Sequence, residues 1–199
     1  MKWYEAPIVV VDFETTGFQP PQAVVEVGAV RYEGGTEVDR LELLVRPRAR
    51  IEPGATCVHG FTDDDVAAQP YFEARYPLLR EFFTQAVPAS YGAYDQRVLR
   101  GELGRMVRRG LEVDEGVPAF SRAWGPWLDL LGWARRLYPG PRRKGMHTLG
   151  TMAEKHGIEL ARAHRAIDDA AAAAELLWAW RDQLPDVGLA ELLRERLPK

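Results

Sequence analysis

Five side chains suited to metal and acid–base chemistry lie far apart along this chain of 199 residues. Asp12 and Glu14 end an apolar run, Asp95 lies near the middle, and His164 and Asp169 come late, five positions apart. Carboxylates that folding brings together form an oxygen-rich site for hard divalent cations. A histidine beside such a site is suited to deprotonating a water molecule as a general base. The set predicts metal-assisted hydrolysis, most plausibly of a phosphodiester.

The first two acids end a predicted strand. Residues 7–13 are continuous and β-branched, which is typical of a buried strand. A strand would direct Asp12 and Glu14 to one face and Phe13 to the other, into the core. Carboxyl ends of strands are where α/β proteins commonly bind ligands. A lone D-x-E pair has an ordinary alternative, namely a strand end whose acids simply face water.

The late pair lies at the start of a predicted helix. Asp168 and Asp169 precede an alanine-rich segment that predicts a helix over residues 170–180. Acids at this place stabilise a helix through its dipole, and that ordinary role would explain either one. It does not explain His164, which would lie just outside the helix and within reach of a metal bound by Asp169. The inference therefore depends on the whole set.

The remaining pattern predicts an α/β fold with helices around a central mixed five-stranded sheet. Short connectors make the first three strands antiparallel neighbours. Thr62 and Asp65 form a capping box for a short helix that ends by Pro70. The other predicted strands cover residues 24–32, 38–46, 87–91 and 127–128, and the other helices cover residues 71–86, 94–109, 129–137, 148–156 and 189–197. Residues 114–123 are expected to form a surface loop.

Bulk properties predict one soluble, cytoplasmic domain over residues 1–199. The single cysteine, Cys57, excludes an internal disulfide and suits a reducing cytosol. No apolar stretch approaches bilayer length, so no membrane partner is expected. The net charge of −3 does not exclude nucleic acid, because four candidate site acids outweigh it. Arginine-rich segments at 97–109 and 135–144 favour either nucleic-acid contact or a solvated helix face.

Five ordered motifs resemble those of the DnaQ-like exonucleases, the DEDDh group within the ribonuclease H-like fold. The matching segments are Val11-Asp12-Phe13-Glu14-Thr15-Thr16-Gly17, the loop Cys57-Val58-His59-Gly60-Phe61-Thr62, Ala93-Tyr94-Asp95, His147-Thr148-Leu149 and His164-Arg165-Ala166-Ile167-Asp168-Asp169-Ala170. They run in family order from about residue 7 to residue 180, which implies an exonuclease core there and leaves residues 181–199 as a helical C-terminal tail. Arg165 occupies the position of the tyrosine in the family's other branch, so the histidine branch is indicated.

The resemblance implies a role for each chemical residue. Asp12, Glu14 and Asp169 would bind two Mg²⁺ ions about 4 Å apart, with Asp12 bridging both and Mn²⁺ as a substitute. Asp95 would help to hold the second ion, through water. His164 would deprotonate the attacking water.

The same resemblance implies contacts with the substrate. Thr15, Thr16 and His59 would approach the terminal nucleotide. Phe18 and Tyr94 would stack or wedge against bases, since an aromatic face contributes roughly 1–3 kcal/mol per base. The ordinary alternatives are a turn residue for Phe18 and a core residue at a helix start for Tyr94.

The predicted function is a 3′-to-5′ exonuclease that releases mononucleotides from single-stranded ends. Ser90-Tyr91 replaces the His-Asn pair of many proofreading members. The aromatic followed by glycine, Tyr91-Gly92, together with the later Ile167-Asp168-Asp169, resembles the RNA-trimming, ERI-type members. The motif Glu14-Thr15-Thr16-Gly17 is more similar to DNA proofreading members, so DNA is slightly favoured over RNA. A DNA polymerase partner and the oligomeric state stay open. Two alternatives are a catalytically silent nucleic-acid-binding or polymerase-accessory module, which the five intact residues disfavour, and a phosphatase or nucleotide hydrolase.

Overall fold

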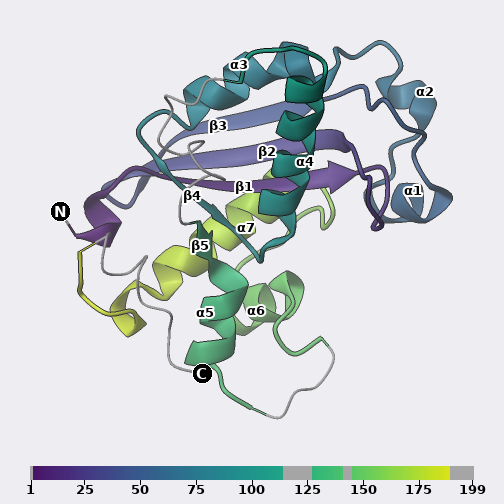
Figure 1. Ribbon diagram of the computed structural model, residues 1–199. Helices are drawn as coiled ribbons and strands as arrows, with labels where there is room; N and C mark the ends of the chain where they lie inside the picture. Colours follow the sequence, from purple (N-terminus) through teal and green to yellow (C-terminus); the bar gives the residue numbers. More distant parts are fainter. Residues whose placement is uncertain (1, 114–126, 141–144, 189–199) are drawn as a thin grey trace.

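The computed structural model describes residues 2–113, 127–140 and 145–188, and its centre is a five-stranded sheet (Figure 1). The strand order is β3-β2-β1-β4-β5. The strands are β1 (Ile8–Thr15), β2 (Val24–Glu33), β3 (Thr36–Leu44), β4 (Val87–Ser90) and β5 (Leu128–Asp129). β2 pairs antiparallel with β1 and β3, whereas β4 pairs parallel with β1 and β5. The predicted mixed sheet is confirmed.

Helices cover both faces of this sheet, with α3 and α4 on one side and α7 on the other (Figure 1). The helices are α1 (Pro53–His59), α2 (Asp63–Val66), α3 (Phe72–Phe82), α4 (Tyr94–Arg108), α5 (Leu130–Leu137), α6 (Leu149–His156) and α7 (Ala166–Ala179), with short 3-10 turns at Trp3–Glu5 and Arg181–Gln183. Alternation along β1 builds both cores, because Val9 and Val11 pack with α3 and α4 while Ile8 and Val10 pack with α7. Among the described residues, no helix is long and apolar enough to cross a membrane.

The register of β1 against β2 determines which residues meet α7. Asp12 lies opposite Gly28, and Glu14 lies opposite Glu26. Gly28 leaves room for α7 itself, since a Cβ atom there would be 2.0 Å from the carbonyl carbon of Ala166. The first turn of α7 therefore rests on β2, directly beside the two acids of β1.

Strand bounds shift by up to two residues from those predicted, and three other predicted segments differ from the structure. The expected loop at residues 57–62 begins inside α1, which starts at Pro53 and ends at His59; Gly60 caps it in the left-handed region with φ 83°. α3 ends at Phe82 rather than at residue 86.

The third difference is the start of α7. The helix begins at Ala166 rather than at residue 170, so Asp168 and Asp169 lie inside its first turn. Arg165 makes no side-chain cap, and Glu26 of β2 instead accepts a hydrogen bond from the Ala166 N–H at 2.8 Å. A cap from another strand leaves no local signal in the sequence. The predicted loop at 114–123, the predicted helix at 189–197 and the basic residues 142–144 lie outside the described residues.

Candidate active site

The two strand acids lie at the carboxyl end of β1, and alternation places them on the same sheet face as Ile8 and Val10, which pack with α7. Asp12 is half-buried, and only 9% of Glu14 is exposed. The ladder with β2 is irregular between Glu14 and Thr15, which marks the point where the strand ends. Two carboxylates on one sheet face, one buried and one half-buried, are costly to ionise together without a compensating charge.

Asp95 reaches the same strand from the first turn of α4. It is buried, and its Oδ1 accepts a hydrogen bond from the main-chain N–H of Phe13 at 3.1 Å. The ladder between β1 and β4 stops at Val10, so Asp95 satisfies a backbone donor that β4 does not reach. Asp95 thus joins the edge of β1 between Asp12 and Glu14.

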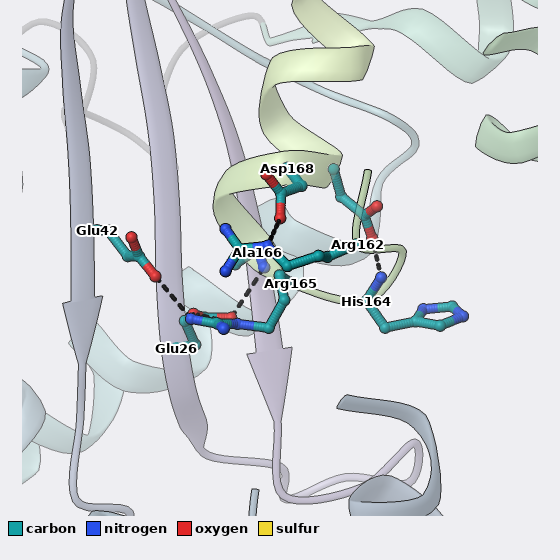
Figure 2. Close-up of polar contacts among 8 residues, drawn as sticks. Glu26, Glu42, Arg162, His164, Arg165, Ala166 and Asp168 are labelled. Carbon is teal, nitrogen blue, oxygen red and sulfur yellow. Dashed lines mark hydrogen bonds and ion pairs between the residues drawn. The ribbon is translucent and has the colours of Figure 1, made fainter. Parts of the chain in front are cut away.

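His164 and Asp169 come from the start of α7. The backbone of His164 is in the left-handed region, with φ 67°, and its N–H donates to Asp169 Oδ2 at 3.2 Å. In Figure 2 the exposed His164 ring points away from Glu26 and Glu42. Ligand atoms of Glu14, His164 and Asp169 lie within 4.8 Å of one another, a trio to which Asp12 and Asp95 do not belong.

Asp169 Oδ1, an oxygen atom of this trio, is buried and has no hydrogen-bond partner among the described residues. A buried carboxylate oxygen without a donor is unfavourable unless a ligand or a cation completes it. This oxygen, together with the neighbouring carboxylates, is the donor set that suits a hard divalent cation.

The electrostatics of the site point the same way. Burial raises the pKa of Asp12 well above its usual range, and repulsion from Asp95, Asp169 and Glu14 raises it further. Burial, followed by repulsion from Asp169, raises the pKa of Glu14 to about 8. Burial also raises the pKa of Asp95 to about 7 and that of Asp169 to about 6. A bound cation would relieve this repulsion, so the residues fit a metal site.

Three predicted substrate-binding residues are turned into the protein. Thr15 Oγ1 lies 2.7 Å from Tyr94 Oη, and Thr16 Oγ1 accepts a hydrogen bond from Ala23 N–H at 3.0 Å. His59 is buried, and burial lowers its pKa. Its Nδ1 accepts a hydrogen bond from the Phe61 N–H, so Nε2 carries the proton and donates to Thr15 O at 3.1 Å. These side chains brace the end of β1.

Phe18 and Tyr94, the two aromatic residues predicted to contact bases, differ in how exposed their side chains are. Phe18 is 64% exposed, directly after the motif that ends β1. Tyr94 is partly buried, and its hydroxyl group donates to Gly17 O at 3.2 Å. Phe18 is therefore open to a base, while Tyr94 joins α4 to the loop that carries Phe18.

Sequence reasoning missed Glu26, the carboxylate opposite Glu14. Glu26 has no exposed surface and contacts Arg165 and the main chain of Ala166 (Figure 2). The available signal was a lone acid inside the apolar run Val24-Val25-Glu26-Val27. A charge in a buried strand is rare unless it is paired.

A family comparison agrees with this geometry. The family model of the RNase_T exonucleases matches residues 9–177, which include all five candidate chemical residues. The chain belongs to the RNase_T exonuclease family. Curated relatives include the PolC-type DNA polymerase III of Thermotoga maritima, 27% identical over 190 residues, and that of Oceanobacillus iheyensis, 33% identical over 176 residues. These matches cover 94% and 88% of this chain but only 13% and 11% of the relatives.

Solved structures share the fold. The nuclease domain of 3′hExo, a DEDDh family member bound to rAMP, superposes with a TM-score of 0.73 at 18% identity, covering 92% of this chain and 95% of that one. Escherichia coli exonuclease I in complex with a dT13 oligonucleotide gives a TM-score of 0.72 at 20% identity, covering 88% and 41%. The predicted likeness to DEDDh exonucleases and the ribonuclease H-like fold are confirmed.

Proposed function

We propose that this member of the exonuclease family is a metal-dependent 3′-to-5′ exonuclease that releases mononucleotides from single-stranded ends. The observation that carries the proposal is the trio of Glu14, His164 and Asp169, whose ligand atoms lie within 4.8 Å of one another. Within the described part of the chain, Asp169 Oδ1 also has no hydrogen-bond donor. All five residues of the predicted set lie at one end of β1 or beside it.

Asp12, Glu14 and Asp169 are the proposed holders of two Mg²⁺ ions, for which Mn²⁺ substitutes, and Asp95 assists through water. Bound ions would supply a nucleophile at neutral pH and stabilise the leaving oxygen. The carboxylates fit such ions because each of them has a raised pKa in the metal-free protein.

His164 is the proposed general base. Its exposed ring stands beside two of the acids, so a ring nitrogen can take a proton from water and return it to solvent. The N–H bond to Asp169 Oδ2 sets the main chain from which the ring projects. The proposed proton acceptor, His164, and the acid Asp169 are therefore held by one short segment at the start of α7.

Phe18 and Tyr94 are the proposed contacts for the terminal bases. They lie next to the end of β1, which the side chains of Thr15, Thr16 and His59 support. The exposed ring of Phe18 offers a stacking face, and the Tyr94 hydroxyl group holds the loop in place. Stacking does not read the base, so we expect cleavage with little sequence preference.

Single-stranded DNA is the favoured substrate, and RNA is the alternative. Curated relatives named as PolC-type DNA polymerase III support DNA and also support a DNA polymerase as a partner. The fold neighbour bound to rAMP keeps RNA in consideration. Cleavage of DNA and RNA strands of the same sequence, compared in one assay, distinguishes these two substrates.

The test is a gel time course with 5′-labelled, single-stranded DNA and RNA carrying 3′-hydroxyl ends. Each strand is incubated with Mg²⁺, Mn²⁺ or EDTA, with wild type and Asp12→Asn in parallel. We expect a ladder that shortens from the 3′ end, needs a metal and is absent in the variant. Binding of both strands without cleavage would instead indicate a silent binding module. Strands with 3′-phosphate ends are incubated alongside, and release of phosphate from these strands without shortening of any strand would indicate a phosphatase.

A further inference from the structure

Glu26 is a fully buried carboxylate, and both of its oxygens accept hydrogen bonds from residues at the start of α7. Oε1 accepts hydrogen bonds from Arg165 Nε at 2.9 Å and Nη2 at 2.7 Å. Oε2 accepts a hydrogen bond from the Ala166 N–H at 2.8 Å. Three donors, two of them on a guanidinium, offset the cost of burying this charge. Glu26 is therefore committed to the helix and not available as a further metal ligand.

Arg165 extends the same connection to two other parts of the fold. Its Nη2 also contacts Glu42 of β3 at 2.6 Å, as Figure 2 shows. The guanidinium carbon lies 5.1 Å from the centre of the Phe61 ring, which follows α1. One planar group thus joins β2, β3, α7 and the segment between α1 and α2.

The main chain of α7 is seated on β2 beside this contact. Two residues along from Glu26, Gly28 meets the main chain of Ala166 and Ile167, and a Cβ at Gly28 would lie 2.0–2.2 Å from these atoms. The glycine therefore sets how close the helix comes to the sheet, while Glu26 sets where along the strand it begins.

His164 and Asp169, the two candidate site residues at the start of α7, lie on either side of the contact between Arg165 and Glu26. His164 immediately precedes Arg165, and the N–H of Asp169 donates to the Arg165 carbonyl at 3.0 Å. Both therefore move with Arg165. On the neighbouring strand, Glu26 lies directly opposite Glu14. The residue that contacts the start of α7 and the acid of β1 are therefore cross-strand partners.

We propose that Glu26 is a positioning residue, which acts through Arg165 and the Ala166 N–H to hold His164 and Asp169 against Glu14. The proposal rests on the function proposed above. Partners that orient metal ligands without touching the metal typically change metal affinity or activity 10- to 100-fold when they are replaced. Among the described residues, Glu26 forms no hydrogen bond with a candidate ligand, but its charge also helps to raise the pKa of Glu14 and Asp169. First-turn amide exchange is the measurement that isolates its effect through the main chain of α7.

The test compares Glu26→Gln with wild type and with Glu42→Gln as the matched control. Glutamine keeps the shape and one acceptor, but its amide NH₂ would face a donor of Arg165 or Ala166. The control removes the solvent-exposed partner of the same arginine and leaves Glu26 in place. Three quantities are measured at a temperature where all three proteins are folded: Mn²⁺ affinity by calorimetry, kcat and KM on single-stranded DNA, and amide hydrogen exchange.

For Glu26→Gln we expect Mn²⁺ affinity and kcat to fall about 10- to 100-fold, with KM changed by less than about threefold. Amide exchange should accelerate in the first turn of α7, at Ala166, Asp168 and Asp169, and stay unchanged near its centre in the metal-free protein. Glu42→Gln should resemble wild type in all three. A folded Glu26→Gln protein with wild-type affinity, kcat and first-turn exchange would overturn the proposal, as would a loss of thermal stability alone.

If Glu26→Gln does not fold, Arg165→Lys serves in its place, because lysine keeps the positive charge but cannot form the paired contact. The same three changes are expected, and their absence again overturns the proposal. A wild-type protein that neither binds Mn²⁺ nor cleaves DNA would contradict the proposed function. The exchange measurement, made without metal or substrate, would still decide whether Glu26 holds α7.

Discussion

The Asp95 carboxylate accepts a hydrogen bond from the main-chain N–H of Phe13, at 3.1 Å. Phe13 lies between Asp12 and Glu14, so this bond fixes the strand from which both acids project. Asp95 therefore has a structural contact of its own, whatever it contributes to metal binding.

Two substitutions separate these contributions of Asp95. Asp95→Asn keeps an oxygen that accepts the Phe13 N–H, so the fold should persist while metal-dependent cleavage falls. Asp95→Ala leaves a buried donor without a partner and should cost a further 1–3 kcal/mol or so in the free energy of unfolding. Denaturant unfolding and the gel assay measure the two effects. Equal stability of both variants would contradict the structural contact.

Asp169 and Asp168 form a matched pair in the first turn of α7. Asp168 contacts Arg162 Nε at 2.7 Å, whereas Asp169 Oδ1 has no partner among the described residues. We expect Asp169→Asn to abolish metal-dependent cleavage and Asp168→Asn to retain it, with both proteins folded. Cleavage assays and circular dichroism test this. Activity of Asp169→Asn near that of wild type would remove it from the proposed metal site.

His164→Ala should lower kcat on the order of 10²- to 10⁴-fold, the usual worth of a positioned general base. The side chain is exposed, so the variant should keep the stability of wild type. Single-turnover kinetics with Mg²⁺ measure the effect, and thermal unfolding provides the control. An unchanged rate would exclude His164 from proton transfer.

The raised pKa values predict how stability of the metal-free protein depends on pH. The pKa of Glu14 is about 8 in the folded protein and 4.5 ordinarily, so the folded state holds this proton more tightly. As pH rises from about 4.5 to about 8, the unfolded state ionises first, and the free energy of unfolding falls. Mg²⁺ or Mn²⁺ should restore stability most at pH 8. Glu14→Gln should flatten the profile, and an equal slope in this variant would argue against the assignment.

Gly28→Ala should damage the site without touching any acid. The new methyl group would lie 2.0 Å from main-chain atoms of α7, so the helix must move, at a cost of at least about 1–3 kcal/mol. We expect lower thermal stability and loss of cleavage. Gly150→Ala in α6 is the control, because its Cβ would meet no described residue within 4 Å and alanine favours helix. A fully active Gly28→Ala protein would show that α7 is not seated on β2 as described.

The strand acids could be predicted because local spacing alone puts Asp12 and Glu14 on one face. The contribution of Glu26 could not, since it depends on the register that places it opposite Glu14 and on a helix about 140 residues later in the chain. The early start of α7 escaped prediction for the same reason: its cap comes from β2. Phe18 and His59 were both predicted to contact the substrate, and burial, which depends on the folded chain, separates the exposed ring of Phe18 from the buried ring of His59.

α7 completes a site whose first acids lie near the other end of the chain. During translation, Asp12 and Glu14 leave the ribosome early, and His164 and Asp169 follow only after most of the polypeptide has been made. On the proposed assignment, a growing chain has no complete hydrolytic centre until α7 has emerged and settled on β2.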